Sequence, residues 1–322
     1  MFNILHTKLN SKYGRIEIEK YSMASNQVNF SPAKFRQLRI PRYSKDLNNV
    51  IEKLTYKSFE NLRNSKQAYG QAENILFQEI GLQDFAPNKE PINIKNFKDS
   101  FATSGRLDAE YYQPKYEDYE NLILNQQHTF IKNEYIHIKT KSKKDKIGYN
   151  YIEIGNVNVS DGSNKSNYVL TKDLPANAKN LVERGDILIS NVRPYRGAVT
   201  IVNSDKENLI ASGAFTVLRK DKSSIFNNEV LKVLLRSKVY KDWLLKFNVG
   251  TSYPVIKDAD VLNLPIPFVK KEKQQQIADL IEKSFSLKKQ SEHLLVVAKK
   301  AVEIAIEENE EIALNFINSQ KV

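Results

Sequence analysis

The stretch FRQLRIPRYSKDLNNVIEKLTYKSF, residues 35–59, is matched without a gap by VLNLPIPFVKKEKQQQIADLIEKSF, residues 261–285. A shorter match in the same register pairs LNSKYGR from Leu9 with LRSKVYK from Leu235. A repeat at this distance indicates two copies of a domain-sized unit. Only 40 residues precede Pro41, whereas well over a hundred precede Pro267 in the second copy. The sequence therefore predicts one complete unit and the end of another.

Both copies are predicted to continue as long helices, over residues 44–82 and 268–318, because prolines and glycines are rare there. In each helix one row of mostly small residues recurs every seven positions, which is a heptad pattern. Small residues let two helix backbones approach closely, so we expect the two helices to pack on each other, as an antiparallel pair if a rotation relates the two units. Roughly 35 residues would make a rod about 50 Å long. The alternative is two unrelated amphipathic helices on a globular core. The predicted seam consists of Ile51, Ser58, Ser65, Ala72, Ile277, Ser284, Ser291 and Ala298.

The segment between the two long helices is predicted to form a connector and a mixed domain. Residues 83–105 contain prolines and alternating polar residues, which is typical of a connector. A short helix is expected over residues 108–124 and a helical stretch over 229–247. Four β-branched runs, beginning at residues 151, 186, 197 and 214, are predicted strands. The fold class is therefore α+β, with a mixed α/β domain over residues 106–267.

Composition favours a polyanionic partner and excludes several kinds of site. The 322 residues include 49 Lys and Arg against 38 Asp and Glu, a net charge of +11, which favours nucleic acid. There is no cysteine, and the four histidines are scattered, so no metal-ligand spacing is present. No apolar stretch approaches the roughly 20 residues of a membrane helix. We expect a cytoplasmic protein without a membrane partner or a bound metal.

No catalytic centre is predicted. No Asp or Glu is followed by a lysine two residues later, so the D/E-x-K half of a common metal-dependent nuclease motif is missing. The chain also has no G-x-S-x-G, Walker loop, dinucleotide fingerprint or Pro-Pro of a DNA methyltransferase. Catalysis by this chain alone is therefore not expected.

Three segments combine basic, aromatic and hydroxyl side chains as nucleic-acid interfaces do. The loop 139–146 is cationic, and its alternative interpretation is a solvated charge run. The turn 191–197 follows a strand, and its alternative is a simple hairpin cap. The loop 249–255 lies between helix and strand, and its alternative is a helix C-cap with Gly250 in the left-handed region. The candidate DNA-binding residues are Lys139, Lys141, Lys143, Lys144, Lys146, Arg193, Tyr195, Arg196, Gly250, Thr251, Ser252 and Tyr253.

Three motifs in order resemble the specificity (S) subunit of type I restriction-modification systems. RLDAEYYQPKY (106–116) is similar to the start of a target recognition domain. RGDILISNVRPYRG (184–197) lies inside it, and the segment 250–281 resembles its end and the following conserved helix. The resemblance covers nearly the whole chain and implies a target recognition domain with two long conserved helices packed as an antiparallel coiled coil. Residues 1–43 then resemble the remnant of a first recognition domain.

The resemblance also implies function and partners. In the family, each recognition domain binds one half of a split DNA sequence, and the coiled coil sets the distance between the halves. Separate modification subunits methylate adenine, and a restriction subunit joins them. Double-stranded DNA and modification subunits are thus the expected partners, with the restriction subunit, a second specificity chain or self-association as further ones. S-adenosylmethionine, ATP and Mg²⁺ are expected on partner subunits only.

Two other functions stay open at this point. One is a coiled-coil interaction protein that does not bind DNA, in which the basic loop is only solvated. The other is a specificity module with nuclease activity of its own, which the missing motifs disfavour.

Overall fold

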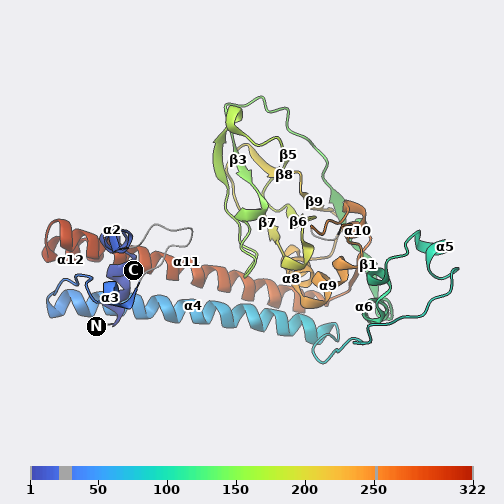
Figure 1. Ribbon diagram of the computed structural model, residues 1–322, viewed down its shortest axis with the longest axis horizontal. Helices are drawn as coiled ribbons and strands as arrows, with labels where there is room; N and C mark the ends of the chain where they lie inside the picture. The colour runs from blue at the N-terminus through green and yellow to red at the C-terminus, as the bar shows by residue number, and fades with distance from the viewer. Residues whose placement is uncertain (1, 22–30, 251–252, 321–322) are drawn as a thin grey trace. The chain divides into compact units, whose positions relative to one another are not determined.

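The computed structural model describes residues 2–21, 31–250 and 253–320 (Figure 1). The chain divides into two compact units, one formed by residues 1–70 with 281–322 and the other by residues 71–280. The two long helices, α4 (Lys45–Glu79) and α11 (Lys271–Glu307), contribute residues to both units. The expected α+β class is confirmed.

In the first unit, α4 and α11 lie side by side and run in opposite directions (Figure 1). The Ser58 and Ser291 hydroxyl oxygens are 2.9 Å apart, and those of Ser65 and Ser284 are 3.1 Å apart. All four serines are at least 96% buried. The predicted packing of the two helices is thus confirmed.

The other seam positions follow the same antiparallel register. Ile51 and Ala298 belong to one apolar cluster, and Ala72 and Ile277 are fully buried. Because Ser and Ala dominate the seam, the helix backbones come close enough for serine hydroxyls to bond across it. The apolar cluster that contains Ile51 and Ala298 also includes Ile4, Leu47, Leu54, Leu294, Val297, Ala301, Val302, Ala313 and Ile317.

The serine pairs make a testable contribution to stability. The Ser284 hydroxyl donates to the Ser65 carbonyl oxygen at 2.8 Å and lies against the Ser65 hydroxyl. Replacing Ser284 by alanine should lower the free energy of unfolding by about 1–2 kcal/mol, because it deprives the buried Ser65 hydroxyl of this partner. Ser65→Ala with Ser284→Ala together should cost less than the sum of the two single changes. Exposed Ser286→Ala is the control, and additive losses in denaturant unfolding would contradict the interpretation.

The helix predicted over residues 268–318 is wrong in one respect, since it is divided into α11 and α12 (Glu310–Ser319). Asn309 has extended backbone angles (φ −163°, ψ 173°), and its side chain accepts a hydrogen bond from the Ile312 amide. Asparagine favours this N-cap position, and Glu310 and Glu311 are stabilised by the positive end of the new helix dipole. Local capping therefore ends a helix that apolar periodicity alone would continue.

The sequence repeat is also a structural repeat. Helices α1 (Phe2–Asn10) and α8 (Asn228–Arg236) have corresponding bounds, and α2 (Lys12–Tyr21) and α9 (Lys238–Leu245) begin at corresponding residues. The serine between each pair, Ser11 or Ser237, accepts a hydrogen bond from the amide three residues later. Two short helices, α3 (Pro32–Phe35) and α10 (Asp258–Leu262), begin at corresponding residues as well.

The second unit contains two four-stranded sheets (Figure 1). The first has the order β2-β9-β6-β7 and is antiparallel throughout, and the second has the order β4-β3-β8-β5 with β3 and β8 parallel. β1 and β10 form a separate antiparallel pair. The strands are β1 (His128–Phe130), β2 (Tyr135–His137), β3 (Gly148–Ile152), β4 (Asn167–Leu170), β5 (Ala178–Leu181), β6 (Ile187–Ser190), β7 (Val199–Ile201), β8 (Leu209–Ser212), β9 (Phe215–Lys220) and β10 (Pro265–Pro267).

The core of the second unit follows from strand alternation. Ile152 of β3 and Leu188 of β6 join one apolar cluster, which draws on both sheets. Tyr149 and Tyr151 of β3 face the other way and pack with Ile210. Side chains of successive residues point to opposite faces of a strand, so one sheet supports two clusters.

Two predicted helices of this unit are interrupted. The stretch 108–124 is a 3₁₀ turn (Ala109–Tyr112) followed by α6 (Pro114–Leu124), because Pro114 begins a helix but cannot continue one. The stretch 229–247 is α8 and α9, separated by Ser237 as an N-cap. Two further single turns, α5 (Phe101–Ser104) and α7 (Ile131–Glu134), were not predicted.

Candidate nucleic-acid interface

The turn after β6 has a tightly determined backbone. Arg193 has φ 49° and ψ 57°, a left-handed conformation that is uncommon for a residue other than glycine. Pro194 then begins a 3₁₀ turn, and Gly197 ends it with φ 70°. The positive φ favours glycine at this position, and a β-carbon there would also displace the Lys241 side chain, 2.8 Å away. The turn leaves Tyr195 and Arg196 exposed.

The loop that follows α9 lies against this turn. The Arg193 amide donates a hydrogen bond to the Pro254 carbonyl oxygen at 2.8 Å, and Val192 forms an antiparallel bridge with Val255. The Arg193 guanidinium lies over the Tyr253 ring, 4.7 Å from its centroid, and that tyrosine is 54% exposed. Two segments that were predicted separately thus form one surface. The predicted residues Thr251 and Ser252 lie outside the described residues.

Gly250 does not cap a helix. Its φ of 99° is positive, as the sequence predicts, but α9 already ends at Leu245. The C-cap residue is Lys246, which has right-handed helical angles. The C-cap interpretation is therefore wrong, and the positive φ instead allows the loop to turn back.

A polar network that the sequence did not predict supports the end of β6. The side-chain amide nitrogen of Asn191 donates a hydrogen bond to Asp258 Oδ1 at 2.8 Å. The Thr216 hydroxyl donates to Asn191 Oδ1 at 2.6 Å. His137 Nε2 is 3.6 Å from the other Asp258 oxygen. These side chains join β2, β9, β6 and α10 just before the Arg193 turn. Their only signal in the sequence is an Asn or Asp at a strand end or helix start.

Acidification should destabilise the fold around His137, because the charged ring is held in a partly buried position. Burial lowers the pKa of His137, while Asp258 partly opposes the shift and Lys139 adds to it. The unfolded chain, with its histidine pKa of about 6.5, then binds the proton first as pH falls. The contribution of His137 to the free energy of unfolding should therefore be largest above about pH 6.5 and decrease as the pH falls below that value. Denaturant unfolding at two pH values should show a smaller decrease for His137→Gln, and an unchanged decrease would refute the assignment.

The other end of β6 is held by an ion pair between a buried carboxylate and a half-buried arginine. Asp186 is fully buried, and its two carboxylate oxygens accept hydrogen bonds from Arg219 of β9 at 2.8 and 2.9 Å. This hydrogen bond raises the pKa of Arg219. Charge-assisted bidentate bonds fix the register of the two strands. The turn thus extends from a strand that is anchored at both ends.

The lysine-rich loop belongs to the other sheet. Lys141 bridges to Asn180 of β5, and the Lys144 ammonium donates to the Pro175 carbonyl oxygen at 3.2 Å. Lys139, Lys141, Lys143 and Lys146 are exposed, whereas Lys144 is half-buried. Lys146 lies 4.0 Å from the Asp145 carboxylate. The structure therefore brings the Arg193 turn and Tyr253 together but attaches the lysine loop to a different strand.

The geometry suits recognition of hydrogen-bond acceptors. A guanidinium has five donors and no acceptor, and the ring beneath Arg193 holds it in place. Phosphate oxygens and guanine edges in the major groove are acceptors of this kind. Within the described residues, no group of three or more His, Cys, Asp or Glu could hold a metal ion. No helix in those ranges is long and apolar enough to cross a membrane.

Comparison with known proteins identifies the family. Residues 109–295, more than half of the chain, match the sequence profile described as the type I restriction modification DNA specificity domain. The chain belongs to this family. The resemblance inferred from the sequence is thereby confirmed, and the matched residues of this type I specificity domain include the Arg193 turn, Tyr253 and the lysine loop.

One curated relative is the type I restriction enzyme HindI specificity subunit of Haemophilus influenzae, with 31% identity over 112 residues. That match covers 34% of this chain and only 24% of the relative. Among solved structures, the S subunit from M. genitalium matches 92% of this chain and 70% of its own, with 15% identity and a TM-score of 0.47. HsdS from Thermoanaerobacter tengcongensis matches 56% and 46%, with 20% identity and a TM-score of 0.40.

A third solved structure, from a study of assembly and conformational transition of the type I system, matches 56% of this chain and 47% of its own. Its identity is 23% and its TM-score 0.44. The chain thus spans less than half of the length of this structure and of the Thermoanaerobacter subunit.

Proposed function

We propose that this type I specificity chain binds DNA in a sequence-specific manner in the cytoplasm. It recognises one half of a split site and positions modification subunits, and with them a restriction subunit, on that DNA. The observation that supports this most is the Arg193 guanidinium held over the exposed Tyr253 ring at the end of an anchored strand. Base recognition requires donors held in fixed positions, and this pair meets that requirement.

The distribution of charge supports the same proposal. Exposed lysines at 139, 141 and 143 place three positive charges on one loop. Lysine contacts with phosphate add affinity without sequence information, whereas an arginine held in a fixed orientation adds discrimination. One domain thus offers both kinds of contact. S-adenosylmethionine, ATP and Mg²⁺ are assigned to the partner subunits.

A second specificity chain is proposed as a further partner. In the second copy of the repeat, β1 pairs with β10 and buries Ile266 completely. Among the residues that the structure describes, no strand pairs with the corresponding residues 39–41, and Ile40 is 50% exposed. A recognition domain of another chain would supply a strand to residues 39–41 and cover Ile40.

The test uses the full chain purified with its modification subunit. The complex is incubated with a pool of random-sequence duplexes, and the duplexes that remain bound are sequenced. We expect one sequence to be enriched and to bind at least about a thousandfold more tightly than a scrambled duplex. The mass of the complex, measured by light scattering for the wild type and for Ile40→Lys, shows whether a second chain is held through residues 35–41.

Two results would favour the other functions. If no sequence is enriched and all duplexes are released alike, the chain is a coiled-coil interaction protein. If the purified chain alone cuts DNA in the presence of Mg²⁺, it has a nuclease activity of its own.

A further inference from the structure

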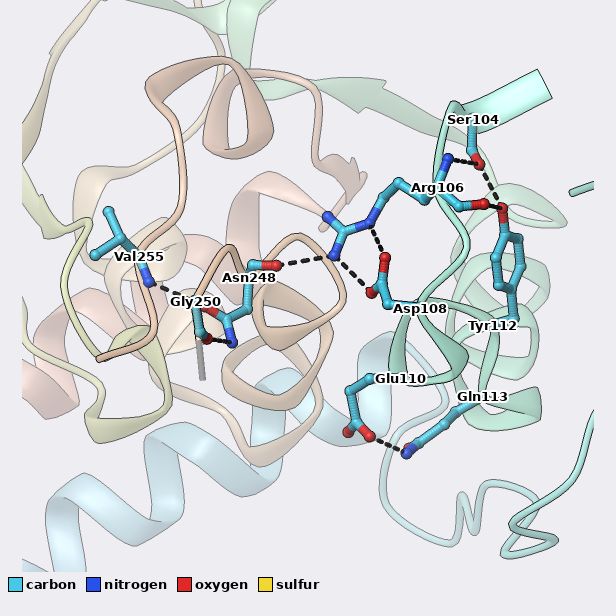
Figure 2. A network of polar contacts seen from close by, with 9 residues as sticks. All are labelled: Ser104, Arg106, Asp108, Glu110, Tyr112, Gln113, Asn248, Gly250 and Val255. Carbon is cyan, nitrogen blue, oxygen red and sulfur yellow. Dashed lines mark hydrogen bonds and ion pairs between the residues drawn. The ribbon is translucent and has the colours of Figure 1, made fainter. Parts of the chain in front are cut away.

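A cluster at the start of the recognition domain contacts the loop that carries Tyr253. The Arg106 guanidinium donates two hydrogen bonds to the Asp108 carboxylate, at 2.8 and 2.7 Å (Figure 2). The same guanidinium donates a hydrogen bond to the backbone carbonyl oxygen of Asn248 at 2.9 Å, although the two residues are 142 positions apart in the sequence. The guanidinium also lies over the Tyr111 ring, 4.7 Å from the centroid. We call Arg106, Asp108 and Asn248 the Arg106 cluster.

The backbone around Arg106 is fixed as well. The Arg106 amide donates to the Ser104 hydroxyl at 3.0 Å, and the Tyr112 hydroxyl donates to the Arg106 carbonyl oxygen at 2.9 Å (Figure 2). The hydrogen bond from Arg106 lowers the pKa of Asp108, so the carboxylate stays ionised at neutral pH. Arg106 is therefore held on both sides before it reaches Asn248.

Asn248 in turn joins the two described ends of the loop. Its side-chain amide donates to the Gly250 carbonyl oxygen at 2.9 Å, and its side-chain oxygen accepts from the Val255 amide at 3.0 Å (Figure 2). Val249 and Val255 also form an antiparallel bridge. One asparagine thus determines how the chain leaves α9 and how it returns after Tyr253.

From Val255 the contacts continue to the Arg193 turn. Val255 forms a β-bridge with Val192. The carbonyl oxygen of the preceding residue, Pro254, accepts a hydrogen bond from the Arg193 backbone amide. The Arg193 guanidinium and the Tyr253 ring are therefore connected to Arg106 by an unbroken series of hydrogen bonds and bridges. A displacement of Asn248 would therefore shift the Tyr253 ring relative to the Arg193 guanidinium.

We propose that Arg106 and Asn248 are positioning residues for DNA recognition, because they hold the Tyr253 loop against the Arg193 turn. This inference rests on the proposed function. Arg106 itself does not bind phosphate, because Asp108 neutralises its guanidinium through two hydrogen bonds. It acts through Asn248, whose side-chain donor and acceptor both bond to the loop backbone. A loss of either residue should thus reduce discrimination between duplexes without altering the electrostatic part of binding.

The experiment compares Arg106→Gln with Arg184→Gln in the complex of the full chain and its modification subunit. Arg184 is a matched control, since it forms an ion pair with Asp205 but is exposed and remote in sequence from the loop. The probes are the duplex recovered from the random pool and a scrambled duplex, each at two salt concentrations. Hydrogen exchange of the peptide containing residues 249–255 is measured on the same samples without DNA.

For Arg106→Gln we expect affinity for the recovered duplex to fall by about tenfold, with the scrambled duplex and the salt dependence changed no more than in Arg184→Gln, which loses the same charge. Exchange in the loop peptide should become faster, and Arg184→Gln should show neither the tenfold loss nor the faster exchange. Asn248→Ala removes both the acceptor for Val255 and the donor to Gly250 without changing the charge, so its effect on the recovered duplex should be of the same kind. On an Arg193→Ala background, Arg106→Gln should change affinity less than about twofold, because the two residues act as one unit.

Each failure has a distinct meaning. A smaller salt dependence for Arg106→Gln than for Arg184→Gln would mean that Arg106 binds phosphate itself, which overturns the positioning role. Unchanged exchange in the loop would overturn it too, whatever the DNA results. If the wild type shows no preference for any duplex but exchange still rises in Arg106→Gln, the proposed function fails, and the cluster then only supports the loop.

Discussion

Replacing Lys139, Lys141 and Lys143 together by alanine is expected to weaken binding to all duplexes alike, by on the order of a hundredfold near 0.1 M salt. These three side chains are exposed, whereas Lys144 donates to Pro175 and supports the loop. Each phosphate contact contributes about 0.9 to the slope of log affinity against log salt, so the slope should become shallower by about 2 to 3. The measurement is binding to the recovered and the scrambled duplex over a range of salt concentrations.

A second triple variant provides the control. Lys53, Lys66 and Lys289 are exposed on α4 and α11, and their replacement by alanine removes the same charge. If the net charge alone governs attraction, both triple variants should lose affinity equally. If the loop contacts phosphate, only its own variant should show the shallower slope. A loss confined to the recovered duplex would instead indicate that these lysines contact bases.

The long helices could be predicted from the sequence because their signal is strong and local. A seven-residue period in Ser, Ala and Leu continues over many turns, and the two copies share one register. Once Ser58 faces Ser291, antiparallel packing brings the other seam residues opposite one another. The heptad pattern does not predict that the helix ends before Asn309, because a single capping side chain is not a periodic signal.

The strands were harder to predict than the helices. The runs that begin at residues 186 and 214 are continuous β-branched segments in the centre of a sheet, and they form β6 and β9. β1, β2 and β10 have only three residues each, too few to show an alternation. The pairing of β1 with β10 depends on residues more than 130 positions apart, which no local pattern reveals.

The candidate site was predicted as separate segments and not as a surface. Residue type and turn chemistry identify Arg193 and Tyr253 individually, but their contact depends on how the loop after α9 returns. Arg106 and Asn248 escaped notice as site residues because each makes its contact through a backbone carbonyl or amide. Arg106 begins the motif RLDAEYYQPKY, but a contact with a backbone carbonyl places little demand on the sequence of its partner, so the motif does not reveal the link to Asn248.

Replacing Arg193 by lysine is expected to reduce affinity for the recovered duplex by about 1–3 kcal/mol and to change binding to a scrambled duplex little. Lysine keeps the positive charge and the β-carbon, so the left-handed backbone at this position and any attraction to phosphate are retained. It lacks the planar fork that forms two parallel hydrogen bonds to a guanine edge, and it stacks less well on the Tyr253 ring. The change therefore isolates orientation from charge.

Two further variants complete this test. Tyr253→Leu should reproduce part of the loss on the recovered duplex, because the guanidinium is then no longer held at 4.7 Å from a ring. Arg196→Ala tests the exposed arginine of the same turn. Competition binding on the duplex recovered from the random pool, with each of its base pairs changed in turn, would locate the affected position. Arg193 recognises a base if its lysine variant loses discrimination at one position only. Equal losses on the recovered and scrambled duplexes would show that the turn contacts only the phosphate backbone, and base recognition would then have to come from other side chains of the 249–255 loop.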